Sequence, residues 1–186
     1  MAVSYKSSKD RLKSVNEHRD LLVQSLRKQL VPVLTEKQFE AVPLMHRGPV
    51  DREAVETLPL GRLRRLREGR VDLIQIQVAR YRVAFRIMTG VVPRDGLMTF
   101  TGHWAPEDVL VDWLDEYFTM YACPRFRIWF SVRHWPHRSP VPSDYERLAS
   151  RVAHFSSELE LALREGRVGP HMRRVVIPRH APKGPG

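Results

Sequence analysis

Residues 71–78 read VDLIQIQV and residues 81–88 read YRVAFRIM. Both stretches alternate apolar and polar side chains with a period of two, which is typical of a β-strand with one dry and one wet face. Residues 127–133, which read RIWFSVR, repeat the pattern. We therefore predict that the three stretches form one antiparallel sheet, with an aliphatic face in the core and a face of Gln, Arg and Trp side chains open to solvent.

The aliphatic face should pack against helices that precede and follow the strands in the sequence. Leucines at helical spacing predict a first helix that starts at Ser7 or Ser8 and bends or ends at Pro32. A second helix is predicted to begin at Pro106, and a third to span residues 143–166, between a capping box and a glycine. The side chains expected in the core are Ile74, Ile76, Val83, Phe85, Ile128, Phe130, Leu22, Leu26, Trp113, Phe118, Leu148 and Phe155.

The remaining segments complete the predicted fold. Short apolar stretches at 39–45 and 175–177 predict additional strands, whereas the basic stretch 62–70, RLRRLREGR, predicts a loop or short helix. The order of elements indicates an α+β fold, in which a small, mainly antiparallel sheet has helices packed on one face. We expect a single domain over residues 1–178 and a disordered basic tail at 179–186.

Composition restricts the class of protein. The chain has 186 residues, of which 42% are hydrophobic and 9% aromatic, as in a globular domain with a core of its own. It has no apolar stretch near the roughly 20 residues that a membrane span needs, and no secretory signal at its start. Its single cysteine, Cys123, fits a reducing compartment. We therefore predict a soluble cytoplasmic protein that does not enter a membrane.

The charge points to anionic partners. Lys and Arg total 31 against 21 Asp and Glu, which gives a formal net charge of +10, and 25 of the basic residues are Arg. The planar guanidinium group matches the geometry of carboxylate and phosphate groups, so this bias favours anion recognition. A GC-rich genome would produce the same bias and explains it equally well.

The predicted binding residues combine the basic stretch with the solvent face of the sheet. Trp129 stands out on that face because a large exposed aromatic side chain normally has a partner, either another helix or a ligand. We expect Arg64 and Arg65 to lie outside the core. The candidate binding residues are Arg62, Arg64, Arg65, Arg67, Arg82, Arg86, Arg127, Trp129, Arg133 and Trp135.

The sequence shows no catalytic or metal-binding signature. It lacks the GxxxxGK[ST], GxGxxG, HExxH and GxSxG motifs. His134 and His137 have a spacing that could place both on one metal ion, but Pro136 between them favours a loop. We therefore predict no catalytic residue, no cofactor and no metal.

Three stretches together resemble a bacterial family of domains of unknown function, family 4304. They are residues 30–39 (LVPVLTEKQF), 71–78 and 81–92, in which a helix with a Leu-x-Pro-x-Leu-like end runs into a Phe and a strand pair rich in Ile, Val and Gln follows. The chain departs from the family at Gln38, where a glycine is expected, and in a basic insertion over residues 46–70. The resemblance implies an α+β fold and a bacterial, soluble, non-enzymatic protein.

Three functions follow as hypotheses. The leading one is a non-catalytic bacterial domain that binds a protein partner, of the immunity or accessory type. The alternative is a nucleic-acid-binding module, which requires the arginines of residues 62–67 to share one positive surface with Arg82, Arg86, Arg127 or Arg133. The third is an enzyme of unrecognised type, with His103 and the loop of His134 and His137 as its candidates.

Overall fold

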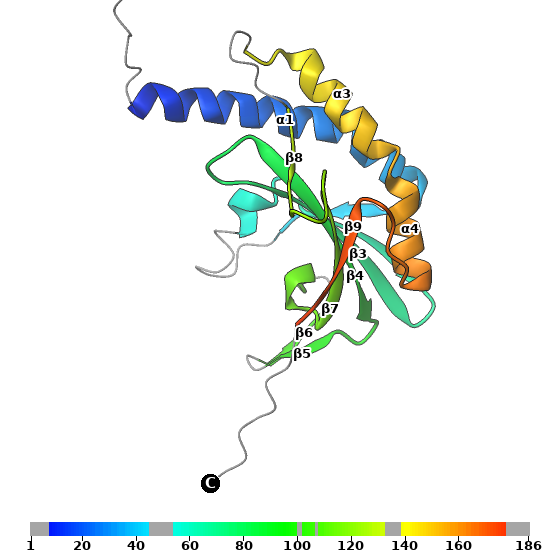
Figure 1. The fold of residues 1–186 in the computed structure, drawn as a ribbon. Coiled ribbons are helices and arrows are strands. Elements are labelled where there is room, and N and C mark those ends of the chain that lie inside the picture. Colours follow the sequence, from blue (N-terminus) through cyan, green and yellow to red (C-terminus); the bar gives the residue numbers. More distant parts are fainter. Residues whose placement is uncertain (1–7, 45–53, 100–101, 107, 133–138, 178–186) are drawn as a thin grey trace, which may run out of the picture.

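The computed structural model describes residues 8–44, 54–99, 102–106, 108–132 and 139–177, with side chains from residue 14 onwards (Figure 1). The longer helices are α1 (Ser8–Glu36), α3 (Pro142–Ala153) and α4 (Ser156–Glu165), and a 3₁₀ turn, η1, spans Val111–Trp113. The strands are β1 (Glu40–Val42), β2 (Arg62–Arg67), β3 (Arg70–Val78), β4 (Ala84–Pro93), β5 (Leu97–Thr99), β6 (Gly102–Trp104), β7 (Glu116–Met120), β8 (Phe130–Ser131) and β9 (Met172–Val176). The predicted tail at 179–186, and Arg133, His134, Trp135 and His137, lie outside the described residues.

The main sheet is antiparallel throughout. Its strands lie in the order β1-β2-β3-β4-β7-β9, and β8 pairs with the first residues of β4. The long hairpin of β3 and β4 forms the centre, where Ile76 lies opposite Ile87 and Val78 opposite Phe85. Strands β5 and β6 form a separate small hairpin. This arrangement confirms the predicted α+β fold with a small antiparallel sheet.

Helices α1, α3 and α4 cover one face of this sheet (Figure 1). The core between them contains the alternate side chains of β3 and β4, such as Ile74 and Phe85, together with Leu22 and Leu26 of α1. Because side chains of a strand alternate between its two faces, this set fixes the register that the sequence predicted. Val83 and Phe155 are only partly buried at the edge of the core.

The opposite face is not the open polar surface that the sequence predicted. Val71, Leu73 and Met88 form a second apolar cluster with Val111 and other residues of the segment 109–117. Gln75, in the middle of this face, is fully buried, and its side-chain Oε1 accepts a hydrogen bond of 3.0 Å from the backbone N–H of Val111. The prediction of a wet face is therefore wrong for the centre of the sheet, because apolar residues interrupt the polar positions there and attract a covering segment.

The helix predicted to begin at Pro106 is absent from the described residues. The chain instead forms η1 and then β7, which inserts between β4 and β9. Tyr117 lies in the second cluster and Phe118 in the main core, on opposite faces, as alternation in a strand requires. Trp113 lies outside both clusters and packs edge-on against Trp104, with ring centroids 5.1 Å apart. Aromatic and Thr residues favour a strand when a neighbouring edge is available.

The basic stretch at residues 62–67 is a strand, β2, and not a loop or short helix. Leu63 lies fully buried in the main core opposite Ile74, and this position requires an extended backbone. Of the expected strand at 127–133, the described residues 127–132 contain only Phe130–Ser131 as a strand. Arg127 has a positive φ of 52°, and Ile128, expected in the core, is 51% exposed because the chain turns before it reaches the sheet.

Phe85 provides the test of this core. Its side chain is fully buried and its ring lies 5.3 Å from that of Phe130. We predict that Phe85→Ala lowers the free energy of unfolding by about 3–5 kcal/mol, because it removes buried apolar area and leaves a cavity. Leu66→Ala, at an exposed position of the same sheet, should change that free energy by no more than about 0.5 kcal/mol. Urea unfolding followed by circular dichroism measures both, and equal losses would contradict the assigned register.

Candidate functional site

The four arginines of β2 do not form a surface patch. Arg62 and Arg65 are only 4% and 5% exposed, so the expectation that Arg65 lies outside the core is wrong. Nη1 of Arg62 lies 3.5 Å from the backbone carbonyl of Val109, on the second face of the sheet. Arg64 faces Glu40 at 3.9 Å, and Arg67 donates to Asp72 at 3.1 Å. These side chains have partners within the protein because β2 is a sheet strand with neighbours on both faces.

Arg65 is the centre of a buried ion network. Its Nε and Nη2 donate to Oδ2 of Asp72 at 3.1 and 2.7 Å, and Asp72 has no exposed surface. Its Nη1 and Nη2 donate to the two carboxylate oxygens of Glu160 at 2.7 and 3.2 Å. Nη1 also donates to the carbonyl of Lys37 at 3.0 Å, and the guanidinium carbon lies 4.4 Å from the centre of the Phe39 ring. The network thereby joins β2 and β3 to α4 and the end of α1.

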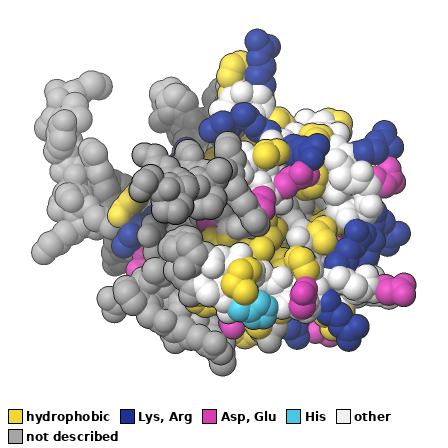
Figure 2. All heavy atoms as spheres, turned by 90° about the horizontal axis from the view of Figure 1, so that it is seen from below, with side chains coloured by type: hydrophobic (Ala, Val, Ile, Leu, Met, Phe, Trp, Pro, Cys, Tyr) yellow, Lys and Arg dark blue, Asp and Glu magenta, His cyan; other side chains and the backbone are white. Residues whose placement is uncertain are grey.

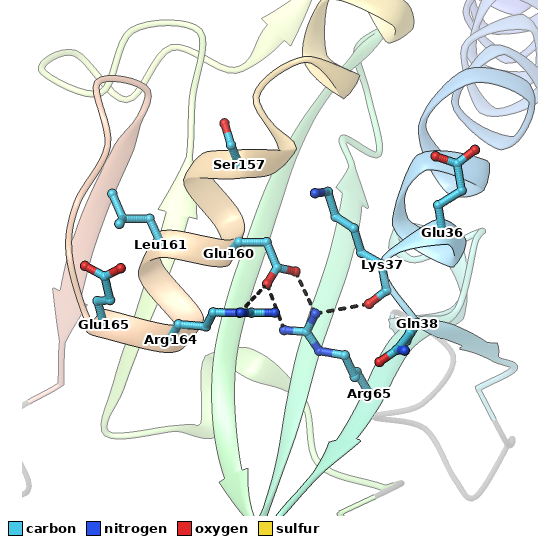
Figure 3. A pocket seen from close by; sticks show the side chains of 9 residues that line it. All are labelled: Glu36, Lys37, Gln38, Arg65, Ser157, Glu160, Leu161, Arg164 and Glu165. Atoms are coloured by element: carbon cyan, nitrogen blue, oxygen red, sulfur yellow. Dashed lines mark hydrogen bonds and ion pairs between the residues drawn. The ribbon is translucent and has the colours of Figure 1, made fainter.

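A cavity of about 500 Å³ opens above this network (Figure 3). Its walls are the residues Glu36, Lys37, Gln38, Arg65, Ser157, Glu160, Leu161, Arg164 and Glu165. Three of them are acidic and three basic, so the site has no excess charge. A guanidinium group has five N–H donors, and Arg65 makes five hydrogen bonds to protein acceptors. The cavity therefore offers a ligand no donor from its most buried cation, and we interpret it as a structural junction.

The network keeps its groups charged. Burial by itself would lower the pKa of Arg65, but the hydrogen bonds and charges of Glu160 and Asp72 outweigh it and raise that pKa. Burial would likewise raise the pKa of Glu160, but its contacts with Arg65 and Arg164 outweigh burial and lower that pKa. Both residues are therefore ionised at neutral pH.

Removal of one partner should destabilise the fold. We predict that Arg65→Met lowers the free energy of unfolding by about 3–5 kcal/mol, because Asp72 then remains buried without its main counter-ion. The matched control is Arg164→Met on α4, which removes an exposed partner of the same Glu160 and should cost less than about 1 kcal/mol. Urea unfolding at neutral pH compares the two. A loss for Arg65→Met no larger than for its control would show that the network is not a junction.

Glu160 should make stability depend on pH. Since its pKa is lowered in the folded protein, its ionised form adds stability above the ordinary glutamate pKa of about 4.3, and this contribution disappears as the pH falls through the lower folded value. We predict that wild type exceeds Glu160→Gln in unfolding free energy near neutral pH and that the difference shrinks below about pH 4.3. The control is Glu165→Gln, whose partner Arg167 is exposed. A difference that stays constant across a pH series of urea titrations would contradict the mechanism.

A second cluster lies at the other end of the central hairpin, and we name it the Trp129 site. It consists of Gln77, Arg82, Arg86, Tyr121 and Trp129. The guanidinium carbons of Arg82 and Arg86 lie 4.9 and 4.8 Å from the ring centroid of Trp129, within the range of cation–π attraction. Arg86 is also held by hydrogen bonds from Nε to Oε1 of Gln77 at 2.7 Å and from Nη1 to the hydroxyl of Tyr121 at 3.2 Å.

The fold explains why these residues meet. Gln77 of β3 and Arg86 of β4 are opposite each other in the hairpin register, and both point to the second face. Tyr121 follows β7, and Trp129 immediately precedes β8. The apolar residues of the segment 109–117 cover the centre of the second face, and its Asp112 interacts electrostatically with Arg86 at the edge of this cover. Gln77, Arg86 and Tyr121 are therefore fixed in position while Arg82 stays exposed.

A hollow of about 310 Å³ lies beside Trp129. Its walls are formed by Thr57, Gln77, Val78, Ala79, Arg80, Tyr81, Arg82 and Trp129. Tyr81 is 78% exposed, and the guanidinium carbon of Arg80 lies 5.4 Å from the centre of its ring. Arg80 also pairs with Glu56 at 3.2 Å. The hollow is thus lined by aromatic rings and basic groups.

The loop of residues 122–128 extends this surface. A backbone hydrogen bond of 3.0 Å from Ile128 to Cys123 closes the loop, which presents Phe126, 67% exposed, and Ile128 to solvent. Arg125 lies over the Phe126 ring. Burial raises the pKa of Tyr117; the charge of Arg86 and, less strongly, that of Arg127 oppose this rise, and Asp112 adds to it. The loop leads directly into Trp129 and carries exposed aromatic and basic side chains up to it.

Three of the predicted binding residues come together here, Arg82, Arg86 and Trp129, whereas Arg127 lies in the loop two residues before Trp129. The prediction missed Gln77, Tyr81 and Tyr121 as site residues. Gln77 could have been found from its position opposite Arg86, had the hairpin register been considered. The helix predicted from Pro106 onwards includes Tyr121, so the sequence does not place its hydroxyl next to Arg86.

Another exposed apolar area lies at the β5–β6 end of the molecule. Figure 2 shows this face from below, with hydrophobic side chains gathered near its centre and basic side chains beside them. Met98 is exposed there, but Trp104 packs on Trp113 and donates from Nε1 to the Thr99 hydroxyl at 3.1 Å. Since the tryptophan pair has its own partners, the Trp129 site remains the better candidate for ligand contact.

The described residues give no support for a membrane-spanning helix or a metal site. Within them, no helix combines the length and apolar character that a membrane crossing requires. No group of three or more His, Cys, Asp or Glu side chains in that part of the chain could hold a metal ion. His103 is exposed and its Nε2 contacts the backbone carbonyl of Asp95 at 2.5 Å. This contact places neither a nucleophile nor a carboxylate next to the imidazole.

A comparison with known proteins finds no matching family model, no similar curated protein and no similar solved structure. The resemblance to family 4304 therefore stays a prediction. Function has to be argued from the geometry of the site.

Proposed function

We propose that this protein is a non-catalytic binding domain that recognises a protein partner through the Trp129 surface, which we define as the Trp129 site together with Arg80, Tyr81 and residues 125–128. The observation that carries the proposal is the combination of Trp129 under two guanidinium groups with the exposed rings of Tyr81 and Phe126. Trp, Tyr and Arg are the residue types that dominate binding energy at protein interfaces. Several large exposed aromatic side chains on one surface favour such a role.

The preorganisation of the surface supports the same function. Arg86 is fixed by Gln77, Tyr121 and Trp129, so it loses little conformational freedom when a partner binds. The loop that carries Phe126 is closed by backbone hydrogen bonds between Cys123 and Ile128. A rigid centre surrounded by longer basic side chains is the usual arrangement of an interface with a central anchor and a polar rim.

The nucleic-acid alternative has less support. It required the arginines of β2 to join the positive surface at Trp129, but Arg62 and Arg65 are buried, and Arg64 and Arg67 face carboxylates. Affinity for nucleic acid depends on the number of phosphates that are contacted, and the loss of these side chains reduces it. The ring of Trp129 is also in contact with two guanidinium groups, which limits the stacking of bases on it.

We also propose the kind of protein and the compartment in which this binding takes place. A bacterial, cytoplasmic protein of the immunity or accessory type fits the family resemblance and the free thiol of Cys123, which a reducing compartment preserves. An enzyme draws the least support, because His103, its remaining described candidate, contacts a backbone carbonyl.

Site-specific photo-crosslinking tests the proposal. Benzoylphenylalanine is introduced in place of Tyr81, of Phe126 or, as a control, of the exposed Leu66 on β2, and the full-length protein is irradiated in its native cells. We predict that positions 81 and 126 crosslink to one and the same protein and that position 66 does not. The added substitution Arg82→Glu should abolish the crosslink. The proposal would be contradicted by adducts that nuclease removes, or by identical products from all three positions.

A further inference from the structure

We infer that the Trp129 surface recognises an acidic segment of its partner, in which Asp or Glu carboxylates bind Arg82 and Arg86 and an adjacent apolar side chain enters the hollow next to Trp129. The inference rests on the proposed protein-binding function and adds to it the chemistry of the partner.

The first argument is unbalanced charge. Among the described residues, Arg82, Arg125 and Arg127 form no ion pair with a carboxylate. Arg86 forms none either, but Asp112 is its acidic neighbour: burial raises the pKa of Asp112, and the charge of Arg86 opposes that rise. The arginines at the other end of the sheet differ, since Arg65 and its neighbours share Asp72 and Glu160. The surface around Trp129 therefore concentrates positive charge that an acidic partner would neutralise, and complementary potentials speed encounter and select the partner.

The second argument is the geometry of the arginines. A guanidinium group that rests on an aromatic ring still has N–H groups to donate, and these match a carboxylate in a bidentate arrangement. The side chain of Arg82 donates no hydrogen bond to any described residue, so its donors are available, whereas its position is restrained by Trp129. Arg86 uses Nε for Gln77 and one Nη1 donor for Tyr121, and its remaining donors face no described acceptor.

The third argument is the hollow itself. Its volume of about 310 Å³ is at the lower end of the range of ligand pockets and suits one or two side chains. Tyr81 and Trp129 give it aromatic walls, and Val78 and Ala79 add apolar atoms. An aliphatic or aromatic anchor placed here would bring acidic neighbours in its segment next to Arg82, whereas Arg80 already has Glu56 as its partner. An acidic segment with a central apolar residue is thus the occupant that fits both the exposed arginine and the apolar hollow.

Fluorescence anisotropy with short synthetic probes tests this inference on the full-length protein. The main probe is a labelled peptide of alternating Glu and Asp with one central Phe. The comparison probes replace the acidic residues with Gln and Asn, or replace the Phe with Gly, and a labelled oligothymidine represents nucleic acid. All are titrated at physiological ionic strength, where contacts between exposed charges alone are strongly screened.

We expect the acidic peptide with Phe to bind and the neutral peptide not to bind. Arg82→Gln should weaken the acidic peptide by about tenfold or more, as expected for the loss of a close charged contact. The matched control, Arg151→Gln, removes the same charge from an exposed position on α3, a helix on the other face of the sheet, and should change affinity less than twofold. Circular dichroism should be unchanged for both variants.

Three results would overturn the inference: equal losses for the two variants, no binding of the acidic peptide, or tighter binding of oligothymidine that Arg82→Gln abolishes. The last would move the site to the nucleic-acid class. Crosslinking at positions 81 and 126 separates the two proposals. A shared protein crosslink without acidic-peptide binding refutes only the acidic partner, whereas loss of both refutes the binding function as well.

Discussion

The contact between Arg65 and Asp72 is the constraint on which the packing of this protein depends. Two charged groups lie inside the sheet–helix layer, and each is tolerated there because the other is present. Any arrangement that shifts β2 along β3 separates the pair and leaves a carboxylate in a medium of low polarity. Glu160 and the carbonyl of Lys37 extend the same requirement to α4 and to the end of α1. A single guanidinium group thus selects the strand register and the position of two helices.

The internal partners of the arginines reduce the positive charge that the protein presents at its surface. A formal charge of +10 suggests a uniformly basic protein, but several arginines are bound to internal carboxylates and carbonyls. The charge that remains available lies where arginines outnumber carboxylates, and the surface around Trp129 is such a place, since Arg82 forms no ion pair with a described residue there. The same residue type therefore has two roles: in β2 it holds the fold together, and at the end of the central hairpin it is exposed to solvent.

The second face of the sheet determines where binding can occur. Its centre is covered by residues 109–117, which bury Leu73 and Met88. The backbone N–H of Val111 in this segment donates to the side-chain Oε1 of Gln75. Only toward the β3–β4 turn do the polar positions of the pattern reach solvent. There Gln77 and Arg86, one pair of the register, hold each other and support Trp129. Partial covering of a sheet face thus turns an alternating strand pattern into a restricted, preorganised surface.

The sequence by itself determined the fold class, the central hairpin and its buried face, because alternation with a period of two is a local property that survives in the folded chain. It also identified Arg82, Arg86, Arg127 and Trp129 as possible neighbours. Only the tertiary structure decided that β2 is a strand with Arg65 buried and that β7 replaces a predicted helix. Arg65 needs Asp72 from the next strand and Glu160 from a distant helix, and β7 needs the free edge of β4. Such partners come from remote parts of the chain, and no local pattern of residues records them.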